Sequence, residues 1–314
     1  MDRQELRNAC GHRMKILLLG KNGQVGWELQ RALNVLGEVI ALDRHVAPTA
    51  YGPLAGDLSD LAALRETIRR VAPNVIVNAA AYTAVDKAET ERELAHTVNA
   101  LASQVMAEEA KRLDALLVHY STDYVFDGTG TEPWKETDAV APVNYYGATK
   151  LEGEQLIVAS GCKHLIFRTS WVYAARGNNF AKTMLRLAKD RETLNVIADQ
   201  IGVPTGADLL ADIAVAALQK ALINPELCGI YHLAPAGETS WHAYATFVIE
   251  FARANGELLA VNAINPIATT AYPTPASRPL NSRLATEKLR DSFSLHLPDW
   301  QSGVTRMLME ALNK

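Results

Sequence analysis

Short, nearly unbroken runs of apolar residues alternate along the chain with longer segments in which apolar residues recur every three or four positions. The unbroken runs predict buried strands at 14–19, 38–42, 74–78, 116–120 and 164–168. The periodic segments between them predict helices at 25–36, 61–71, 86–97, 100–113 and 146–159. Strands that are apolar on both faces and alternate with helices are typical of a parallel sheet covered on both sides. The expected fold class is therefore α/β, with a doubly wound parallel sheet.

Three glycines follow the first predicted strand and lead into a helix. Gly20, Gly23 and Gly26 are spaced as G-x-x-G-x-x-G, with Gln24 and Val25 between the last two. Glycines at a strand-to-helix turn allow the backbone to turn tightly and to approach a diphosphate at the helix N-terminus. A purely structural turn is the alternative, because the spacing differs from the common G-x-G-x-x-G pattern. The position between strand and helix favours phosphate binding.

An acidic residue, Asp43, ends the second predicted strand. A carboxylate at this place is suited to the ribose hydroxyls of an adenosine. Arg44 follows directly and could instead meet a 2′-phosphate, so the choice between NAD and NADP stays open. A solvated carboxylate at a strand end is the other interpretation of Asp43.

A tyrosine and a lysine four residues apart provide candidate proton chemistry. Tyr146 and Lys150 share one face of the predicted helix, and Thr122 follows an apolar strand. A neighbouring ammonium is expected to lower the pKa of a phenol, which is about 10 when free. Tyr145 lacks a lysine one turn further on, so Tyr146 is the better acid. Ser121 competes with Thr122 for the hydroxyl role, since strand alternation points them to opposite faces.

The pattern loosens after Thr169. Helices are expected near 179–189, 206–222 and 241–255, separated by loops rich in glycine and proline at 202–205 and 272–279. We therefore divide the chain into an extension at 1–13, predicted to be disordered, a dinucleotide-binding domain at 14–170, and a region at 171–314. The last is mainly substrate-binding, with some segments returning to the sheet. Trp171 is either a core residue or a stacking surface for a sugar or base, and Arg278 either meets a diphosphate or is simply exposed.

Composition narrows the function classes. A net charge of −4 over 314 residues argues against a general nucleic-acid binder, which would carry a basic surplus. Three cysteines without paired spacing suggest neither a disulfide framework nor a zinc site, which fits a reducing cytosol. The sequence contains no apolar run near the ~20 residues needed to cross a bilayer, so no membrane association is expected.

Taken together, these motifs resemble the short-chain dehydrogenase/reductase superfamily, in its extended branch that acts on nucleotide sugars. The segments that carry the resemblance are 20–28, 77–87, 119–126, 146–150, 168–173 and 278–282. They extend over nearly the whole chain from Met14 onward. The departures are the first 13 residues and the segment 46–54, which is longer than expected near the adenosine end.

The resemblance implies a Rossmann-like fold and reduction of the 4-keto group of dTDP-4-dehydro-β-L-rhamnose by NADPH or NADH. That reaction is the last step towards dTDP-L-rhamnose, a precursor of O-antigen and other surface polysaccharides. It further implies a cytoplasmic homodimer, with Mg²⁺ at a subunit contact lined by glutamates such as Glu28, although no metal-ligand cluster is visible in the sequence. The implied catalytic residues are Tyr146 as proton donor, Lys150 and Thr122. The implied cofactor-binding residues are Gly20, Gly23, Gln24, Val25, Gly26, Asp43, Asp57, Leu58, Ala81, Tyr82, Thr83, Tyr120, Tyr146 and Lys150. The implied substrate-binding residues are Thr122, Asp123 and Trp171.

Two rival functions use the same fold. A non-catalytic, dinucleotide-binding regulatory subunit would not need the set formed by Thr122, Tyr146 and Lys150. Another nucleotide-sugar enzyme, an epimerase or dehydratase, would keep its cofactor bound throughout. A dehydratase would also require further carboxylates beside Thr122, and Asp123 alone does not clearly provide them.

Overall fold

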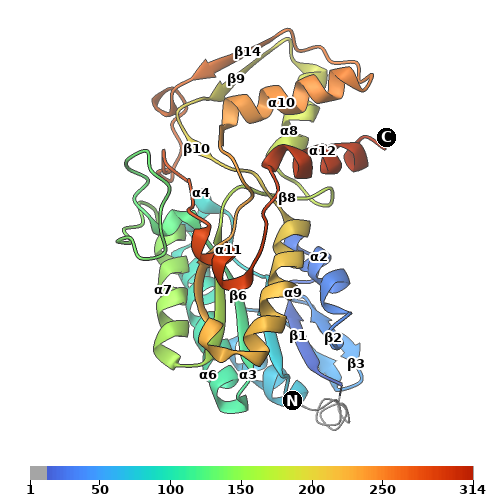
Figure 1. Cartoon of the computed structure of the whole chain (residues 1–314), viewed down its shortest axis with the longest axis vertical. Coiled ribbons are helices and arrows are strands. Elements are labelled where there is room, and N and C mark those ends of the chain that lie inside the picture. Colours follow the sequence, from blue (N-terminus) through green and yellow to red (C-terminus); the bar gives the residue numbers. More distant parts are fainter. Residues whose placement is uncertain (1–12, 314) are drawn as a thin grey trace.

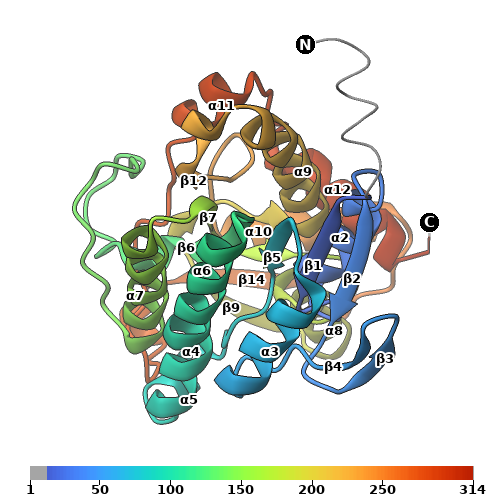
Figure 2. The same cartoon turned by 90° about the horizontal axis from the view of Figure 1, so that it is seen from below.

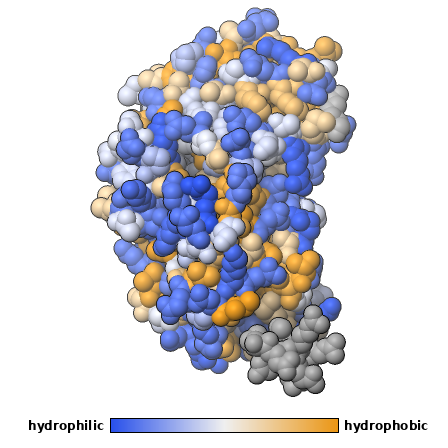
Figure 3. Space-filling model, viewed as in Figure 1, coloured by the Kyte–Doolittle hydropathy of each residue, from blue (hydrophilic) through white to orange (hydrophobic). Residues whose placement is uncertain are grey.

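The chain forms a large sheet-based body with a smaller lobe above it (Figure 1). The computed structural model describes residues 13–313. The extension expected at 1–13 therefore lies, except for Arg13, outside the described residues. Over the face in Figure 3, hydrophilic and hydrophobic residues are interspersed.

The body is built on one six-stranded parallel sheet, and the apolar runs predicted five of its strands. Its strands are β1 (Lys15–Leu19), β2 (Glu38–Leu42), β5 (Val75–Asn78), β6 (Leu116–Thr122), β7 (Lys163–Thr169) and β12 (Gly229–His232). They lie in the order β12-β7-β6-β5-β1-β2, and every neighbouring pair is parallel. The chain turns from one half of the sheet to the other between β1 and β5. At such a switch point, ligands bind beyond the carboxyl ends of the strands.

Helices cover both faces of this sheet, which makes it doubly wound (Figure 2). One face carries α2 (Gln24–Leu33), α9 (Ala207–Ile223) and α11 (Glu287–Phe293), whose apolar residues join one buried cluster with the strands. The other face carries α3 (Leu61–Val71), α6 (Ala102–Leu113) and α7 (Tyr145–Ser160) around a second cluster. Segments late in the sequence, α9, α11 and β12, thus complete the body that the first half of the chain begins.

The prediction of one helix over 86–97 is wrong. The structure has two short helices there, α4 (Val85–Ala88) and α5 (Arg92–His96), followed by a π-helical turn, η2 (Thr97–Leu101), that runs into α6. Tertiary hydrogen bonds interrupt the helix: Glu89 accepts the backbone N–H of Tyr145, and Glu91 accepts the phenol of Tyr82. π-turns often occur at functional sites.

The upper lobe has its own apolar cluster. Its helices are α8 (Phe180–Asp190), α10 (Trp241–Ala254) and α12 (Trp300–Ala311), packed beside the parallel pair β9 (Thr193–Ile197) and β14 (Ala263–Ile267). The three helices predicted after Thr169 are confirmed as α8, α9 and α10. Among residues 13–313, no helix is long and apolar enough to cross a membrane.

Shorter elements connect these parts. The long segment at 46–54 forms an antiparallel hairpin of β3 (Ala47–Thr49) and β4 (Gly52–Leu54). Two small pairs join β8 (Val172–Tyr173) to β11 (Thr205–Gly206), and β10 (Ile201–Gly202) to β13 (Thr239–Ser240). Single 3₁₀ turns lie at η3 (Asp123–Val125), η4 (Pro225–Leu227) and η5 (Thr269–Ala271).

Candidate active site

The glycine turn lies at the carboxyl end of β1, where two of its glycines are required by packing. Gly20 has φ of 87°, and a Cβ there would lie 2.8 Å from the backbone nitrogen of Ala80. A Cβ on Gly26 would lie 2.0 Å from the carbonyl oxygen of Gly20. These two positions therefore bring α2 close to the sheet.

Gly23 has a different role. A Cβ there would lie no closer than 3.4 Å to the neighbouring atoms, so packing does not demand glycine. Gly23 is the N-cap of α2 and offers no side-chain acceptor to the first helical N–H groups. An open helix N-terminus of this kind fits the negative charge of a diphosphate.

A loop from the second half of the chain lies against the start of α2. Gln24 Oε1 accepts a hydrogen bond of 3.2 Å from Asn179 Nδ2. The Arg176 guanidinium lies 3.8 Å from the ring centroid of Trp27. Val25 packs against the first apolar cluster. Arg176 and Asn179 lie in no motif of the sequence that points to this position, because only the fold brings their loop to the glycine turn.

The residues expected at the adenosine end lie beyond β2. Asp43 accepts hydrogen bonds from Asn22 Nδ2 and from the backbone N–H of His45, and Lys21 Nζ is 4.0 Å from its carboxylate. Asp57 accepts from the backbone and hydroxyl of Ser59. Leu58 is buried in the second apolar cluster.

The loop after β5 carries Ala81, Tyr82 and Thr83 and is fastened by Asn99. The Asn99 side chain accepts the Tyr82 N–H at 2.9 Å and donates to the Tyr82 carbonyl at 3.1 Å. It also donates to the Thr149 hydroxyl on α7 at 3.0 Å. The π-turn that contains Asn99 therefore ties this loop to the helix that holds Tyr146 and Lys150.

Thr122 and Tyr146 meet at the carboxyl end of β6. Thr122 Oγ1 donates to Asp123 Oδ1 at 3.1 Å and accepts the backbone N–H of Tyr124 at 3.2 Å. Burial raises the pKa of Tyr146 to about 12, an effect that the neighbouring Thr122 hydroxyl opposes and the charge of Asp123 reinforces. The phenol is therefore protonated at neutral pH. Thr122 and Tyr146 thus form a ready proton donor and its partner.

Two nearby residues, Asp123 and Tyr145, occupy different environments. Asp123 is buried beside Thr122, and burial raises its pKa to about 6 against the bonds from Ser282 and Thr122. Tyr145 lies under the guanidinium of Arg92, which is 4.6 Å from its ring centroid. Ser121 Oγ is buried and has no hydrogen-bond partner among the described residues. These placements favour Tyr146 over Tyr145 and Thr122 over Ser121.

The expectation that Lys150 lowers the pKa of Tyr146 is not met in this structure. Lys150 Nζ donates to the Tyr120 carbonyl at 2.7 Å and lies 3.1 Å from His119 Nε2. Burial lowers the pKa of Lys150 to about 8, although Glu154 raises it. Both groups are buried, so desolvation dominates the pKa of each and disfavours its charged form.

Tyr120 and Trp171 flank this group. The Tyr120 phenol donates to the carbonyl of Leu210 on α9 at 3.3 Å, so only its backbone oxygen faces Lys150. Trp171 has φ of 49° and stacks on Trp241 with ring centroids 3.6 Å apart. A bulky residue in the left-handed region is strained, and such residues cluster at ligand sites. Trp171 therefore suits a stacking surface held in place by Trp241.

Arg278 is neither an open diphosphate contact nor a free surface residue. Its guanidinium makes two hydrogen bonds to Asp86, of 3.0 and 2.7 Å, to opposite carboxylate oxygens. Asp86, the first residue of the helix predicted at 86–97, thus anchors the proline-rich loop at 272–279.

The described residues give no support to the Mg²⁺ expectation. Glu28 lies 3.6 Å from Arg31 Nε, and residues 13–313 contain no group of three or more histidine, cysteine, aspartate or glutamate residues arranged to hold a metal ion. No step of the chemistry is derived through a metal.

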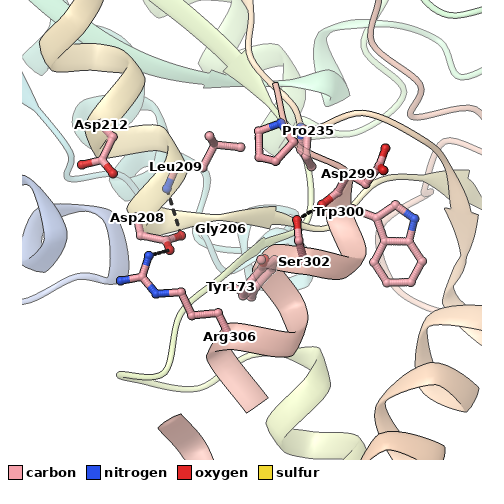
Figure 4. A pocket seen from close by; sticks show the side chains of 12 residues that line it. Tyr173, Gly206, Asp208, Leu209, Asp212, Pro235, Asp299, Trp300, Ser302 and Arg306 are labelled. Carbon is pink, nitrogen blue, oxygen red and sulfur yellow. Dashed lines mark hydrogen bonds and ion pairs between the residues drawn. The ribbon is translucent and has the colours of Figure 1, made fainter. Parts of the chain in front are cut away.

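A cavity of about 300 Å³ lies away from this group, between α9 and α12 (Figure 4). Asp208 and Arg306 form an ion pair of 3.2 Å on the wall of this cavity. Trp300 also lines the cavity, away from this ion pair. None of the catalytic residues proposed from the sequence lines it. This cavity is therefore distinct from the predicted site at the strand ends.

Known proteins resemble the chain over almost its full length. A family model described as "RmlD substrate binding domain" matches residues 14–313. The dTDP-4-dehydrorhamnose reductase of Shigella flexneri is 58% identical over 95% of this chain and 98% of its own length. That of Burkholderia thailandensis is 48% identical over 96% and 100%.

Solved structures agree with these relatives. The dTDP-4-dehydrorhamnose reductase from Bacillus anthracis, in complex with NADP, superposes with a TM-score of 0.83. It is 34% identical and matches 95% of this chain and 99% of that one. With a parallel sheet, a glycine turn and a Thr122–Tyr146 pair in place, the chain belongs to the RmlD family of dTDP-4-dehydrorhamnose reductases.

Proposed function

We propose that the chain reduces the 4-keto group of dTDP-4-dehydro-β-L-rhamnose to give dTDP-β-L-rhamnose, with NADPH or NADH as the reductant. The observation that carries the proposal is the Thr122–Tyr146 hydroxyl pair at the end of β6. A protonated phenol at the mouth of a parallel sheet can donate its proton to a carbonyl oxygen that is being reduced.

The residues present fit a dinucleotide. Gly20 and Gly26 admit the tight turn, and the open N-terminus of α2 suits the diphosphate beside Gly23, Gln24 and Val25. Asp43 and Asp57 lie at the adenosine side, while Ala81, Tyr82 and Thr83 flank the middle. From β2 to β6 is three strand spacings, about 14 Å. A ligand that reaches both Asp43 and Tyr146 must therefore lie extended across the strand ends.

The reduced nicotinamide supplies a hydride when it is bound. The chain's own residues then supply position and a proton. Tyr146 donates its phenolic proton to the oxygen that gains negative charge, and Thr122 holds that oxygen and the phenol together. Lys150 holds the nicotinamide ribose, Asp123 contacts the sugar, and Trp171 stacks on the substrate. The chemistry is general acid catalysis by an oriented donor.

We include a cytoplasmic location and a homodimer in the proposal. Two described cysteines, Cys162 and Cys228, are free, which fits a reducing compartment. The homodimer rests on the family resemblance alone, and the mass of the purified protein in solution tests it.

A comparison of two adjacent tyrosines tests the proposed reaction. Tyr146→Phe should lower kcat by about 10²- to 10⁴-fold, the usual contribution of a general acid. Tyr145→Phe is the matched control and should stay within about twofold, because its ring faces Arg92 instead. Oxidation of NADPH followed with the keto sugar gives both rates. A non-catalytic subunit would bind the dinucleotide and show no turnover in the unaltered protein.

A further inference from the structure

A directional chain of hydrogen bonds runs from the backbone after β5 to Lys150. It starts at the backbone N–H of Ala80, which donates to Asn78 Oδ1 at 3.1 Å. A backbone N–H can only donate, so this bond fixes which end of the Asn78 amide is oxygen. The Asn78 nitrogen, Nδ2, must therefore face the next member of the chain, His119.

The Asn78 amide in turn fixes the proton on His119. Asn78 Nδ2 lies 3.1 Å from His119 Nδ1, and the amide nitrogen can only donate. Nδ1 is therefore an acceptor, and a neutral imidazole then carries its proton on Nε2. A doubly protonated ring would place two donors face to face. His119 is buried, and burial lowers its pKa well below the usual value.

The proton on His119 Nε2 then points at Lys150 Nζ, 3.1 Å away. An amine has one lone pair and can accept this bond, whereas an ammonium has three donors and no acceptor. Lys150 Nζ also donates to the Tyr120 carbonyl at 2.7 Å, which either form can do. The arrangement satisfies every member only when Lys150 is neutral.

The charges around Lys150 do not oppose this state. Glu154 lies one turn further along α7 and favours the ammonium, but it forms a buried ion pair of 2.7 Å with Arg168 of β7. Tyr146, on the same helix, is neutral at pH 7. Burial lowers the pKa of Lys150 to about 8, in the direction that the hydrogen bonds favour, so the neutral amine predominates above pH 8.

We propose that Asn78 and His119 are positioning residues that favour the neutral amine form of Lys150 in the cofactor-free protein, so that in mildly alkaline solution, where this amine form predominates, dinucleotide binding is coupled to uptake of one proton by Lys150. The coupling step rests on the proposed function, because it needs a bound dinucleotide. The diphosphate charge and the ribose hydroxyls favour an ammonium, which leaves His119 and donates to the ribose.

The first test uses the cofactor-free protein and lysine labelled with ¹³C at Cε. One lysine signal should titrate near pH 8, apart from the others near 10.5, and should be missing from Lys150→Arg. If all the lysine signals titrate together near 10.5, the proposal is overturned. This measurement stands even if no dinucleotide binds, so it separates failure of this proposal from failure of the proposed function.

The second test reverses the chain of hydrogen bonds. In Asn78→Asp the carboxylate still accepts the backbone N–H of Ala80, but it also accepts a hydrogen bond from a proton-bearing Nδ1 of His119. The Nε2 atom of His119 is then an acceptor, so Lys150 can donate to it as an ammonium. Asn74→Asp, at the opposite end of β5, is the matched control; Asn74 Oδ1 accepts the backbone N–H of Lys15.

Calorimetric titration with NADH in buffers of different ionisation enthalpy measures the protons taken up. The unaltered protein and Asn74→Asp should take up about 0.9 proton per chain at pH 9 and almost none at pH 6.5, as linkage requires for a free pKa near 8. Asn78→Asp should take up almost none at either pH. Equal uptake by Asn78→Asp and the unaltered protein would sink the proposal, as would no uptake by the latter at pH 9.

Discussion

Thr122 links the end of strand β6 to the phenol of Tyr146, the proposed proton donor. It ends β6, accepts the N–H of Tyr124, donates to Asp123, and its hydroxyl acts to lower the pKa of Tyr146. Thr122→Val keeps the shape and removes the hydroxyl, so kcat should fall by about 10²-fold, while Thr122→Ser should stay within about threefold. Steady-state rates at saturating cofactor give the comparison. A loss of kcat in Thr122→Ser with Thr122→Val unchanged would mean that the methyl group, not the hydroxyl, matters.

Residue spacing alone identified Tyr146 and Lys150 as a pair, but it did not identify His119 as the partner of Lys150. Tyr146 and Lys150 are one turn apart on α7, which local helix geometry determines. His119 lies 31 positions from Lys150 and meets it only through the packing of α7 on β6. From the sequence alone, a histidine on an apolar strand could equally be a core residue whose hydrogen bonds are satisfied. Burial of both partners then decides their pKa values, and burial at this level follows from the whole fold.

Two glycines of the same turn should respond differently to alanine. Gly26→Ala places a methyl group against the carbonyl of Gly20 and should destabilise the fold by more than about 2 kcal/mol, because strand and helix must separate. Gly23→Ala meets no such contact and should retain stability, yet its methyl group enters the space expected for the diphosphate and should weaken NADPH binding by about tenfold or more. Urea unfolding and cofactor titration separate the two effects. Equal losses of stability in Gly26→Ala and Gly23→Ala would contradict this division between a glycine required by packing and a glycine required by the cofactor.

The packing of α3 on α6 should make stability depend on acid pH. Glu109 on α6 is buried, and although burial raises its pKa, hydrogen bonds from Arg69, Arg112 and Arg65 bring it down to about 2. Since the folded pKa is below the unfolded value of 4.5, the carboxylate stabilises the fold above pH 4.5 and this contribution is lost between pH 4.5 and 2.

We expect this loss to be roughly 2 kcal/mol, because the three arginines are partly exposed and screened. Glu109→Gln should flatten the pH dependence of the unfolding free energy in that window. Glu66→Gln, which removes an exposed i,i+4 pair with Arg70 on α3, is the control and should leave the slope unchanged. An unaltered slope in Glu109→Gln would assign the acid lability to other carboxylates.

At the level of elements, the periodicity of apolar residues predicts helices and strands correctly where their packing is repetitive. The strands of the first half and the helices α3, α8, α9 and α10 follow their apolar patterns. It was insufficient at 86–97, where Glu89 and Glu91 serve distant partners, and at 46–54, where a hairpin forms outside the sheet. At 86–97 the side chain of Glu89 makes a contact 56 residues away that no local pattern reveals, whereas the hairpin at 46–54 pairs residues that are neighbours in the sequence.

On the scale of the whole molecule, the second half of the chain serves both parts. It supplies α9, α11 and β12 to the sheet, and it also supplies the loop at 272–279 that is tied to the front of α7. Asn144, the N-cap of α7, donates to the Ser277 carbonyl at 2.7 Å, and Arg278 donates two hydrogen bonds to Asp86 in α4. This loop therefore lies next to Tyr146, although more than 120 residues separate them in the sequence.

Loosening that loop should affect substrate binding more than chemistry. Arg278→Met removes a two-point ion pair that is only partly exposed, which we expect to contribute about 1 kcal/mol and so about fivefold in KM for the keto sugar. Arg278 has no direct contact with the Thr122 or Tyr146 hydroxyls among its hydrogen bonds, which go to Asp86 and Ala276, so kcat should stay within about twofold. Arg70→Met, which removes an exposed pair on α3, should change neither constant. A fall in kcat with KM unchanged would show instead that the loop positions the proton donor, because only an interaction that is gained in the transition state alters kcat alone.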